Sequence, residues 1–541
     1  MFRRRWAKTR TTGATAGDEG AATGTGRSTP GPDPKEPTLR PWSDHLEPDD
    51  PLVAAGAPGA PRRAAAGTLL RTWAATWEAE PGAPLWKEGD RWWSAGEFDA
   101  ATRRAAGRLR AAGMVPGDRV VWSVPSSVAA LVAHVGALRA GLVVVPANTA
   151  YTRPELAHIV GDVRAAAAVV GRPDQAEWVR AAPSVRVVTG PDLDLPDGDE
   201  GELDAAGPDD PALICFTSGT TGAPKGAVLR HRNLLAATES VTRAWRMSPV
   251  DRLVHCLPVF HAHGLAVGAY GTMTAGGSAV LLPGFDPAAV VGTARDERAT
   301  LFFGVPTMYH RLLASGRAGE LAGLRLCVSG SAPLPADLHA SASEAIGSPV
   351  LERYGMTETL MNTSNPYVGD RRAGTVGFPL PEVEVMLDGA GQVLLRGPNV
   401  FDGYFERAAA NAEAFRDLED GGGPWFATGD LGEDVDGYLV IRGRTKELII
   451  SGGFNVYPTE VEDALAGCAG VAEVAVTGTA SDEWGEVVTA WVVPDGRPPT
   501  VEELRAFCDG RLAPYKQPRR VRVVDSLPRN AMGKVVRSQL G

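Results

Sequence analysis

The sequence predicts an α/β protein with a large N-terminal α/β domain and a smaller α+β unit at its C-terminal end. Its 541 residues, 44% of them apolar, are enough for two to four domains. From about residue 66 short apolar runs alternate with segments of helical spacing, which is typical of layered, largely parallel sheets. After Arg442 helical and strand-like segments form a unit of about 100 residues, an ordinary domain size.

The alternation can be followed along the chain, because each apolar run leads into a segment of helical period. Pro306 stands directly after one such run, where a proline favours the first turn of a helix. Ligand sites in sheets of this kind lie beyond the carboxyl ends of the strands, so the loops there are the first candidates for function. The apolar runs lie at 119–125, 142–148, 213–217 and 301–305.

The first 65 residues differ from the rest of the chain. They begin with a basic stretch and are then dominated by Gly, Pro, Thr and Ala, which predicts a disordered tail over 1–65. The Arg- and Thr-rich start also resembles a transit peptide weakly, so a targeting segment stays an alternative. We place the large domain at 66–442 and the small domain at 443–541, with the boundary near GRTKEL.

Composition excludes several classes of protein. A net charge of −11 argues against a nucleic-acid partner. The five cysteines are odd in number, widely spaced and form no CxxC, so they indicate neither a disulfide framework nor a zinc site. No apolar stretch approaches the roughly 20 residues that span a bilayer. We therefore expect a soluble, cytoplasmic protein without a membrane partner.

The stretch FTSGTTGAPKG, residues 216–226, predicts a loop that binds phosphate groups. Its glycines let backbone N–H groups approach a ligand, its hydroxyls donate hydrogen bonds, and its lysine adds a mobile positive charge. It is not the usual P-loop, because Pro224 precedes Lys225 and Gly226 follows it. A polar surface turn is the alternative. The predicted phosphate-binding residues are Thr217, Ser218, Gly219, Thr220, Thr221, Gly222 and Lys225.

Two later segments carry side chains suited to a nucleotide. In YGMTET, Glu358 is a hard oxygen ligand suited to Mg²⁺, Thr357 can donate to a phosphate oxygen, and Tyr354 can stack on a base. In TGD, Asp430 can accept both hydroxyls of a ribose, and Arg444 can reach the same sugar or the phosphates. Taken singly, each could equally belong to an ordinary turn or the surface.

Six motifs in order resemble the adenylate-forming superfamily of acyl-CoA synthetases, luciferases and peptide-synthetase adenylation domains. The resemblance covers about residues 66–541 and implies a large N-terminal domain of layered α/β subdomains with a small β-barrel. It also implies a small, mobile C-terminal domain that swings between two half-reactions. The motifs are FTSGTTGAPKG, YGMTET, GQVLLRGPNVFDGY, WFATGD, GRTKELIISGG and PRNAMGK.

The resemblance implies roles for individual residues. The loop 217–225 would hold the β- and γ-phosphates of ATP, Glu358 the Mg²⁺, and Asp430 the ribose. Lys534 would bridge the substrate carboxylate and the α-phosphate during adenylation. The catalytic residues would be Lys534, Glu358, His261 and Thr217; the remaining ATP or AMP contacts would come from Ser331, Ala332, Pro333, Tyr354, Gly355, Thr357 and Arg444.

The C-terminal motifs add a hinge and a second half-reaction. Lys446 matches the family's hinge position, and Gly452 and Gly453 match the loop that enters the site for thioester formation. The reaction implied is attack of a carboxylate on the α-phosphate of ATP, followed by attack of the thiol of coenzyme A and release of AMP. ATP, Mg²⁺, coenzyme A and a small carboxylic acid are the ligands expected.

The segment PVFHAHG and its neighbours look most like malonyl-CoA and methylmalonyl-CoA synthetases. His261 would gate the acyl pocket, and the pocket would also include His263, Gly330 and Met356, which would limit chain length. A second carboxylate needs a cation in the pocket. Family members often carry a basic residue before an FDP-like turn, whereas this chain has Gly284 there. The candidate cations are His261, His263, Arg311, Arg371 and Arg372.

Three alternatives stay open. The acid could be another short or medium-chain substrate, and the thiol could belong to a carrier protein rather than to free coenzyme A. A nucleotide-binding scaffold without catalysis is disfavoured, because both Lys534 and Glu358 are present.

Overall fold

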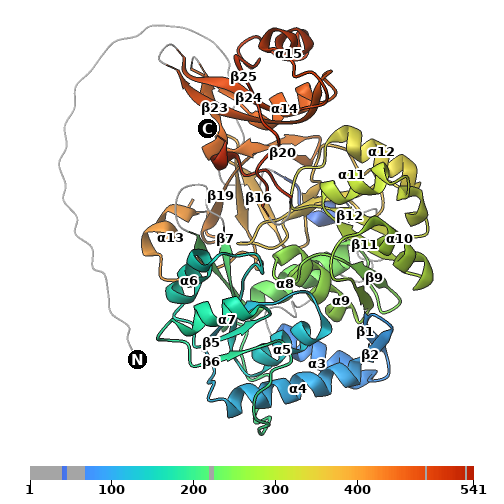
Figure 1. Ribbon diagram of the computed structural model, residues 1–541, viewed down its shortest axis with the longest axis vertical. Helices are drawn as coiled ribbons and strands as arrows, with labels where there is room; N and C mark the ends of the chain where they lie inside the picture. Colours follow the sequence, from blue (N-terminus) through green and yellow to red (C-terminus); the bar gives the residue numbers. More distant parts are fainter. Residues whose placement is uncertain are drawn as a thin grey trace, which may run out of the picture.

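The computed structural model places four sheets and the helices that cover them (Figure 1). It describes residues 39–45, 67–217, 224–418, 420–451, 453–481, 484–530 and 533–540. The candidate loop residues Ser218, Gly219, Thr220, Thr221 and Gly222, together with Gly452, lie outside these ranges, as does most of 1–65. Within 39–45, Trp42 is buried and the Leu39 N–H donates to the Val385 carbonyl at 3.3 Å.

The largest sheet has nine strands in the order β15-β14-β13-β12-β11-β9-β10-β1-β2. The strands from β13 to β1 in this order run parallel to their neighbours, while the edges are antiparallel. The strands are β1 (Pro84–Glu88), β2 (Arg91–Ser94), β9 (Arg252–His255), β10 (Ser278–Leu281), β11 (Leu301–Gly304), β12 (Leu326–Ser329), β13 (Leu351–Tyr354), β14 (Thr363–Ser364) and β15 (Phe378–Pro379).

A second sheet has six strands in the order β6-β5-β3-β4-β7-β8, parallel except for the final hairpin. The strands are β3 (Arg119–Ser123), β4 (Val143–Pro146), β5 (Ala167–Val170), β6 (Val187–Thr189), β7 (Pro211–Thr217) and β8 (Lys225–Arg230).

Helices separate and cover the two sheets, giving a layered α/β arrangement. One core cluster joins residues of both sheets to the helices between them, and two further clusters lie on the outer faces. Between the sheets lie α3 (Leu69–Ala79), α4 (Ala95–Ala111), α5 (Val128–Arg139), α8 (His231–Ala244), the π-helix η2 (His263–Tyr270) and α9 (Gly271–Ala275). The outer helices are α6 (Arg153–Asp162), α7 (Pro173–Arg180), α10 (Pro287–Asp296), α11 (Pro306–Ala314) and α12 (Ala336–Ile346).

Local sequence explains several of these elements. α4 begins with a capping box, in which Ser94 and Glu97 satisfy each other's backbone N–H groups. α11 begins at Pro306, as the sequence predicts. α5 shows no polar stripe because it is buried between the two sheets on nearly every side.

An antiparallel sheet of five strands stands where the resemblance predicts a small β-barrel. Its order is β16-β17-β19-β18, with β20 paired to β19. The strands are β16 (Glu384–Leu387), β17 (Gln392–Arg396), β18 (Phe415–Arg416), β19 (Trp425–Val435) and β20 (Tyr438–Arg444), and α13 (Ala408–Ala414) precedes β18.

The C-terminal unit lies beside β20, at the top of Figure 1. Its sheet has the order β22-β21-β24-β23, with β25 parallel to β24. The elements are β21 (Ile449–Ser451), β22 (Phe454–Val456), α14 (Pro458–Leu465), β23 (Val471–Ser481), β24 (Gly485–Pro494), α15 (Val501–Cys508) and β25 (Arg520–Val523). The predicted α/β class, with a large N-terminal and a smaller C-terminal domain, is confirmed; the exact boundaries stay a prediction. In the described part of the chain, no helix combines the length and apolar character needed to cross a membrane.

Candidate active site

The predicted phosphate loop connects the hairpin strands β7 and β8. Thr217 ends β7 and pairs with Lys225, the first residue of β8. The segment containing Tyr404 runs along the other edge of β8, because Val228 N donates to Gly403 O at 3.1 Å. This pairing places the ammonium of Lys225 5.2 Å from the centre of the Tyr404 ring. The loop therefore ends beside a tyrosine that the sequence analysis did not select.

Tyr404 connects this lysine to the candidate metal ligand. Its hydroxyl donates to Glu358 Oε1 at 3.0 Å. Glu358 is buried, and burial is the main reason that its pKa is raised, while the hydrogen bond from Tyr404 acts against the rise. The described residues include no group of three metal-ligating side chains. A single carboxylate suits Mg²⁺ that keeps its other ligands from phosphates and water.

Asp430 is the centre of a second cluster, where the nine-stranded sheet meets the five-stranded antiparallel sheet. It lies in β19 opposite Arg444 of β20, and Arg444 Nε donates to Asp430 Oδ1 at 2.9 Å. Tyr354, the last residue of β13, donates its hydroxyl to Asp430 Oδ2 at 2.5 Å. Asp430 is only 4% exposed. The aspartate, arginine and tyrosine predicted to contact ribose and base therefore lie together.

Lys534 reaches this cluster from the C-terminal unit. Burial lowers the pKa of its ammonium, the charge of Arg444 lowers it further, and Asp430 and Glu447 oppose both effects. The preceding glycine, Gly533, packs against α11, since a Cβ added there would lie 3.1 Å from Thr307 Oγ1. Gly533 thus lies against the large domain, and Lys534 lies close enough to Asp430 for the charge of the carboxylate to act on its ammonium.

The two histidines of HAHG lie at the start of η2, next to the predicted adenine segment. His263 is buried, and its Nδ1 lies 3.1 Å from the hydroxyl of Ser331. Burial lowers the pKa of His261 to about 4 and that of His263 well below its ordinary value, and the charge of Arg353 lowers both further. Both imidazoles are therefore neutral at pH 7.

Arg353 is a residue of this region that the sequence analysis missed. It stands directly before Tyr354 in ERYGMTET and is 5% exposed. Within the described chain its Nε and Nη2 are buried without a hydrogen-bond partner. Burial lowers its pKa to about 10, so the side chain stays charged at neutral pH. Two charged residues between the apolar Leu351 and the YGMTET turn, in a segment that follows the pattern of a buried strand, are the signal that could have identified it.

The turn after Tyr354 requires a glycine at position 355, where the backbone of Leu360 comes close. A Cβ at Gly355 would lie 2.0 Å from the Leu360 carbonyl oxygen, so no other residue fits without moving the backbone. Met356 Sδ lies 3.8 Å from the Tyr354 hydroxyl, and Thr357, the next residue, is half-buried.

The predicted adenine segment follows β12. Gly330 lies against the guanidinium of Arg353, and Ser331 has a left-handed φ of 69°. Ala332 is half-buried and Pro333 exposed.

Other predicted residues lie outside these clusters. Lys446 is exposed in the short 3-10 turn Thr445–Glu447, and Gly453 is exposed in the β21–β22 turn with φ 83°. Of the candidate cations, Arg311 stacks on Phe285 at 4.9 Å and is exposed.

The remaining two candidate arginines already have contacts. Arg371 donates to the backbone carbonyls of Pro349, Pro366 and Tyr367 at 2.6–3.1 Å. Arg372 forms an ion pair with Asp370 at 2.8 Å.

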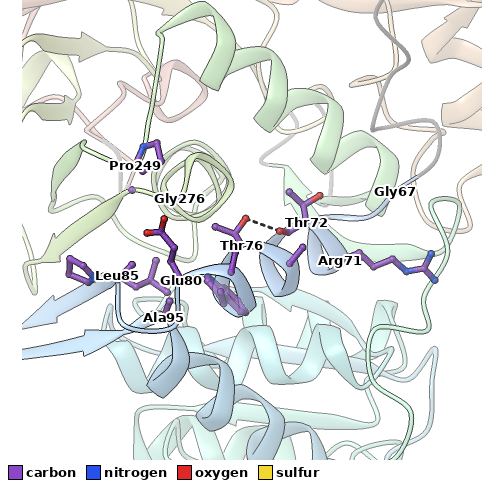
Figure 2. Close-up of a pocket in the computed structure, with 15 residues that line it drawn as sticks. Gly67, Arg71, Thr72, Thr76, Glu80, Leu85, Ala95, Pro249 and Gly276 are labelled. Atoms are coloured by element: carbon purple, nitrogen blue, oxygen red, sulfur yellow. Dashed lines mark hydrogen bonds between the residues drawn. The ribbon is translucent and has the colours of Figure 1, made fainter.

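A cavity of about 730 Å³ lies beside α3 (Figure 2). None of the candidate site residues lines it. The hydroxyl of Thr76, which Figure 2 shows at its wall, donates to the carbonyl of Thr72 at 2.9 Å, within its own helix. The cavity brings together no set of groups suited to catalysis.

Two family models match long segments of this chain. A family model described as AMP-binding enzyme matches residues 71–405, and one described as AMP-binding enzyme C-terminal domain matches 460–534. Feruloyl-CoA synthase of an Amycolatopsis species is 38% identical over 463 residues, covering 82% of this chain and 92% of that protein.

Two further proteins are similar to this chain. Malonate–CoA ligase of Arabidopsis thaliana is 38% identical over 372 residues, covering 61% of this chain and 60% of that protein. The crystal structure of ATP-bound MatB from Rhodopseudomonas palustris is 40% identical with a TM-score of 0.81, covering 87% of this chain and 98% of that one.

Proposed function

The chain belongs to the AMP-binding enzyme family and is an acid–thiol ligase, and we propose that it joins malonate or methylmalonate to coenzyme A with MgATP. The family resemblance predicted from six ordered motifs is confirmed. The choice of acid, the assignment of site residues and the identity of the thiol are the proposal.

The cluster of Asp430, Arg444, Tyr354 and Lys534 is the observation that carries the proposal. Asp430 accepts hydrogen bonds from two side chains and keeps lone pairs for the ribose hydroxyls of ATP. The ammonium of Lys534 lies near it and would face the α-phosphate, where negative charge grows as the substrate carboxylate attacks. Positioning and electrostatics are the protein's contribution, and no covalent nucleophile is needed.

Lys225, Tyr404 and Glu358 would hold the triphosphate end. Lys225 ends the loop that would contact the β- and γ-phosphates, and Glu358 would take the Mg²⁺ bound to them. The ion would offset the charge of the departing pyrophosphate. Because the pKa of Glu358 is raised by burial, binding of the cation would also stabilise its ionised form.

The acyl end favours a short, polar acid. Met356 lies next to Tyr354 where it would limit chain length. His261 and His263 present neutral, polar rings, and that of His263 lies beside Ser331. A relative named for feruloyl-CoA is as identical to this chain as one named for malonate and matches more of it, 463 residues against 372, so an aromatic acid is the rival to test.

The second half-reaction would use the C-terminal unit in another orientation. Lys446 stands at the junction between β20 and β21, where rotation of a few backbone angles would turn the unit, and Gly453 would then approach the site. The thiol would be that of coenzyme A. A carrier-protein thiol is the alternative.

The test is formation of AMP and thioester from ATP, Mg²⁺ and coenzyme A with malonate, methylmalonate, acetate, butyrate, octanoate and ferulate. We expect kcat/KM for the dicarboxylates to exceed the others at least about tenfold, which corresponds to about 1.4 kcal/mol. Preference for ferulate or a monocarboxylate would contradict the proposed acid. Adenylation without thioester formation on added coenzyme A would point to the carrier-protein alternative.

A further inference from the structure

The guanidinium of Arg353 is buried beside the proposed acyl end, and two of its nitrogens lack a hydrogen-bond partner among the described residues. Nε and Nη2 of Arg353 have no hydrogen-bond partner in the part of the chain that the structure describes, and the residue is 5% exposed. An unpaired buried charge is costly, and a protein that tolerates one is expected to receive its counter-charge from a ligand.

The backbone determines which way this side chain lies. Arg353 and Tyr354 are consecutive residues of β13, so their side chains leave the sheet on opposite faces. Tyr354 lies toward Asp430, whereas the charge of Arg353 acts on His261 and His263. The guanidinium therefore lies on the side of the HAHG segment.

Gly330 makes room for the guanidinium. It follows β12 and lies beside Arg353, where a Cβ would fall 2.4 Å from Nε and 2.5 Å from Cζ. The two histidines near it are neutral, so they supply no competing charge. Among the cations weighed for the second carboxylate, Arg371 and Arg372 already have oxygen partners and Arg311 stacks on Phe285.

We infer that Arg353 binds the second carboxylate of the acid and so determines specificity for dicarboxylates. Nε and Nη2 share one edge of the planar guanidinium, and this edge matches the two oxygens of a single carboxylate in a bidentate pair. The substrate class is a short acid with a second anionic group near its reacting carboxylate. The inference rests on the proposed function, because it assigns a residue to the acid proposed there.

The test compares Arg353→Met and Arg353→Lys with the wild-type enzyme on malonate and on acetate. Met removes the charge at similar volume. We expect kcat/KM for malonate to fall roughly 30- to 1,000-fold, mainly through a higher KM, and kcat/KM for acetate to change less than about threefold. Lys keeps the charge but loses the planar fork, so a loss of about tenfold is expected. Arg295→Met, an exposed arginine of α10, is the control and should match the wild type.

A binding measurement separates this role from a structural one. With α,β-methylene-ATP present, malonate should raise the Tm of the wild-type enzyme but not that of Arg353→Met. Without malonate, the Met variant should be at least as stable as the wild type, because it removes an unpaired buried charge.

Results that contradict the role of Arg353 can be told apart from results that contradict the proposed acid. Equal loss on malonate and acetate, or malonate stabilising the Met variant as much as the wild type, would overturn the inference and leave the proposed acid standing. A wild-type enzyme that prefers acetate over malonate would overturn the proposed acid itself, whatever the variants do.

Discussion

Tyr354 and Asp430 join the nine-stranded sheet to the antiparallel sheet: the tyrosine hydroxyl at the end of β13 donates to Oδ2 of the aspartate in β19 at 2.5 Å. Arg444 holds the other carboxylate oxygen at 2.9 Å. A carboxylate has about four lone-pair positions, so these two bonds orient Asp430 and still leave acceptors for a ribose. Side chains of two sheets therefore orient the carboxylate that is proposed to accept the ribose hydroxyls.

We predict that Tyr354→Phe raises KM for ATP roughly three- to tenfold with little change in kcat. The ring stays, but Asp430 loses one of the two donors that orient it. A hydrogen bond to a charged group contributes about 1.5–3 kcal/mol net, and Arg444 still holds the carboxylate. ATP–pyrophosphate exchange with malonate measures the effect. Asp430→Asn should be worse, by about 100-fold, because it also weakens the pairing with Arg444. An unchanged KM in the Phe variant would show that the hydroxyl does not position the aspartate.

We predict that Lys534→Ala abolishes adenylation but leaves thioester formation from pre-made acyl-adenylate largely intact. The ammonium is expected to act only on the charge at the α-phosphate. Because its pKa is lowered, the adenylation rate should fall on the alkaline side below the ordinary lysine value of about 10.5. Lys534→Arg should be slower but show no such fall, since arginine stays charged. Equal loss of both half-reactions in the Ala variant would contradict the role.

Much of the fold follows from local sequence. The runs at 119–125 and 301–305 contain β3 and β11, and Pro306 starts α11 as expected. These elements could be predicted because buried parallel strands are continuous apolar runs and proline marks a first helical turn. The π-helix His263–Tyr270 could not, because it depends on packing between the two sheets rather than on a residue pattern.

The candidate site was predictable only in part. Tyr354, Glu358 and Asp430 stand out by residue type within short motifs, so sequence alone singles them out. The contacts of Tyr404 and Arg353 depend on segments distant in the chain. Tyr404 matters because β8 carries Lys225 beside it, and Arg353 because Gly330 leaves space for it.

We predict that Glu352→Gln becomes more stable than the wild type as pH rises. Burial raises the pKa of Glu352 to about 8, so the native state keeps a proton that the unfolded chain releases above its own pKa of about 4.5. Wild-type stability therefore falls between about pH 4.5 and 8, and the Gln variant lacks this loss.

Calorimetric Tm values at pH 5 and pH 8.5 measure the effect of Glu352. The difference between variant and wild type should be below about 1 kcal/mol at pH 5 and correspond to roughly 2–5 kcal/mol at pH 8.5. Glu413→Gln, at an exposed residue of α13, should match the wild type at both values. A constant difference at both values would mean that Glu352 is ionised in the native state.

We predict that Lys446→Ala slows thioester formation at least about tenfold while adenylation changes little. Lys446 is exposed at the junction of β20 and β21, and we expect it to affect only the step that needs the C-terminal unit to turn. Single-turnover rates for each half-reaction measure this separately. Adenylation and transfer slowed by the same factor would argue against a hinge.

We predict that Gly330→Ala lowers malonate use without removing any charge. The new Cβ would fall 2.4 Å from Arg353 Nε, so the guanidinium must move, and the movement is tolerated because it is the far end of a flexible side chain. If that guanidinium binds the second carboxylate, KM for malonate should rise about tenfold while acetate is little affected. Gly292→Ala, which meets no atom within 4 Å, is the matched control. A Gly330→Ala enzyme with the wild-type preference for malonate would mean that the position of the guanidinium does not matter to the acid, and Arg353 would lose its assigned role.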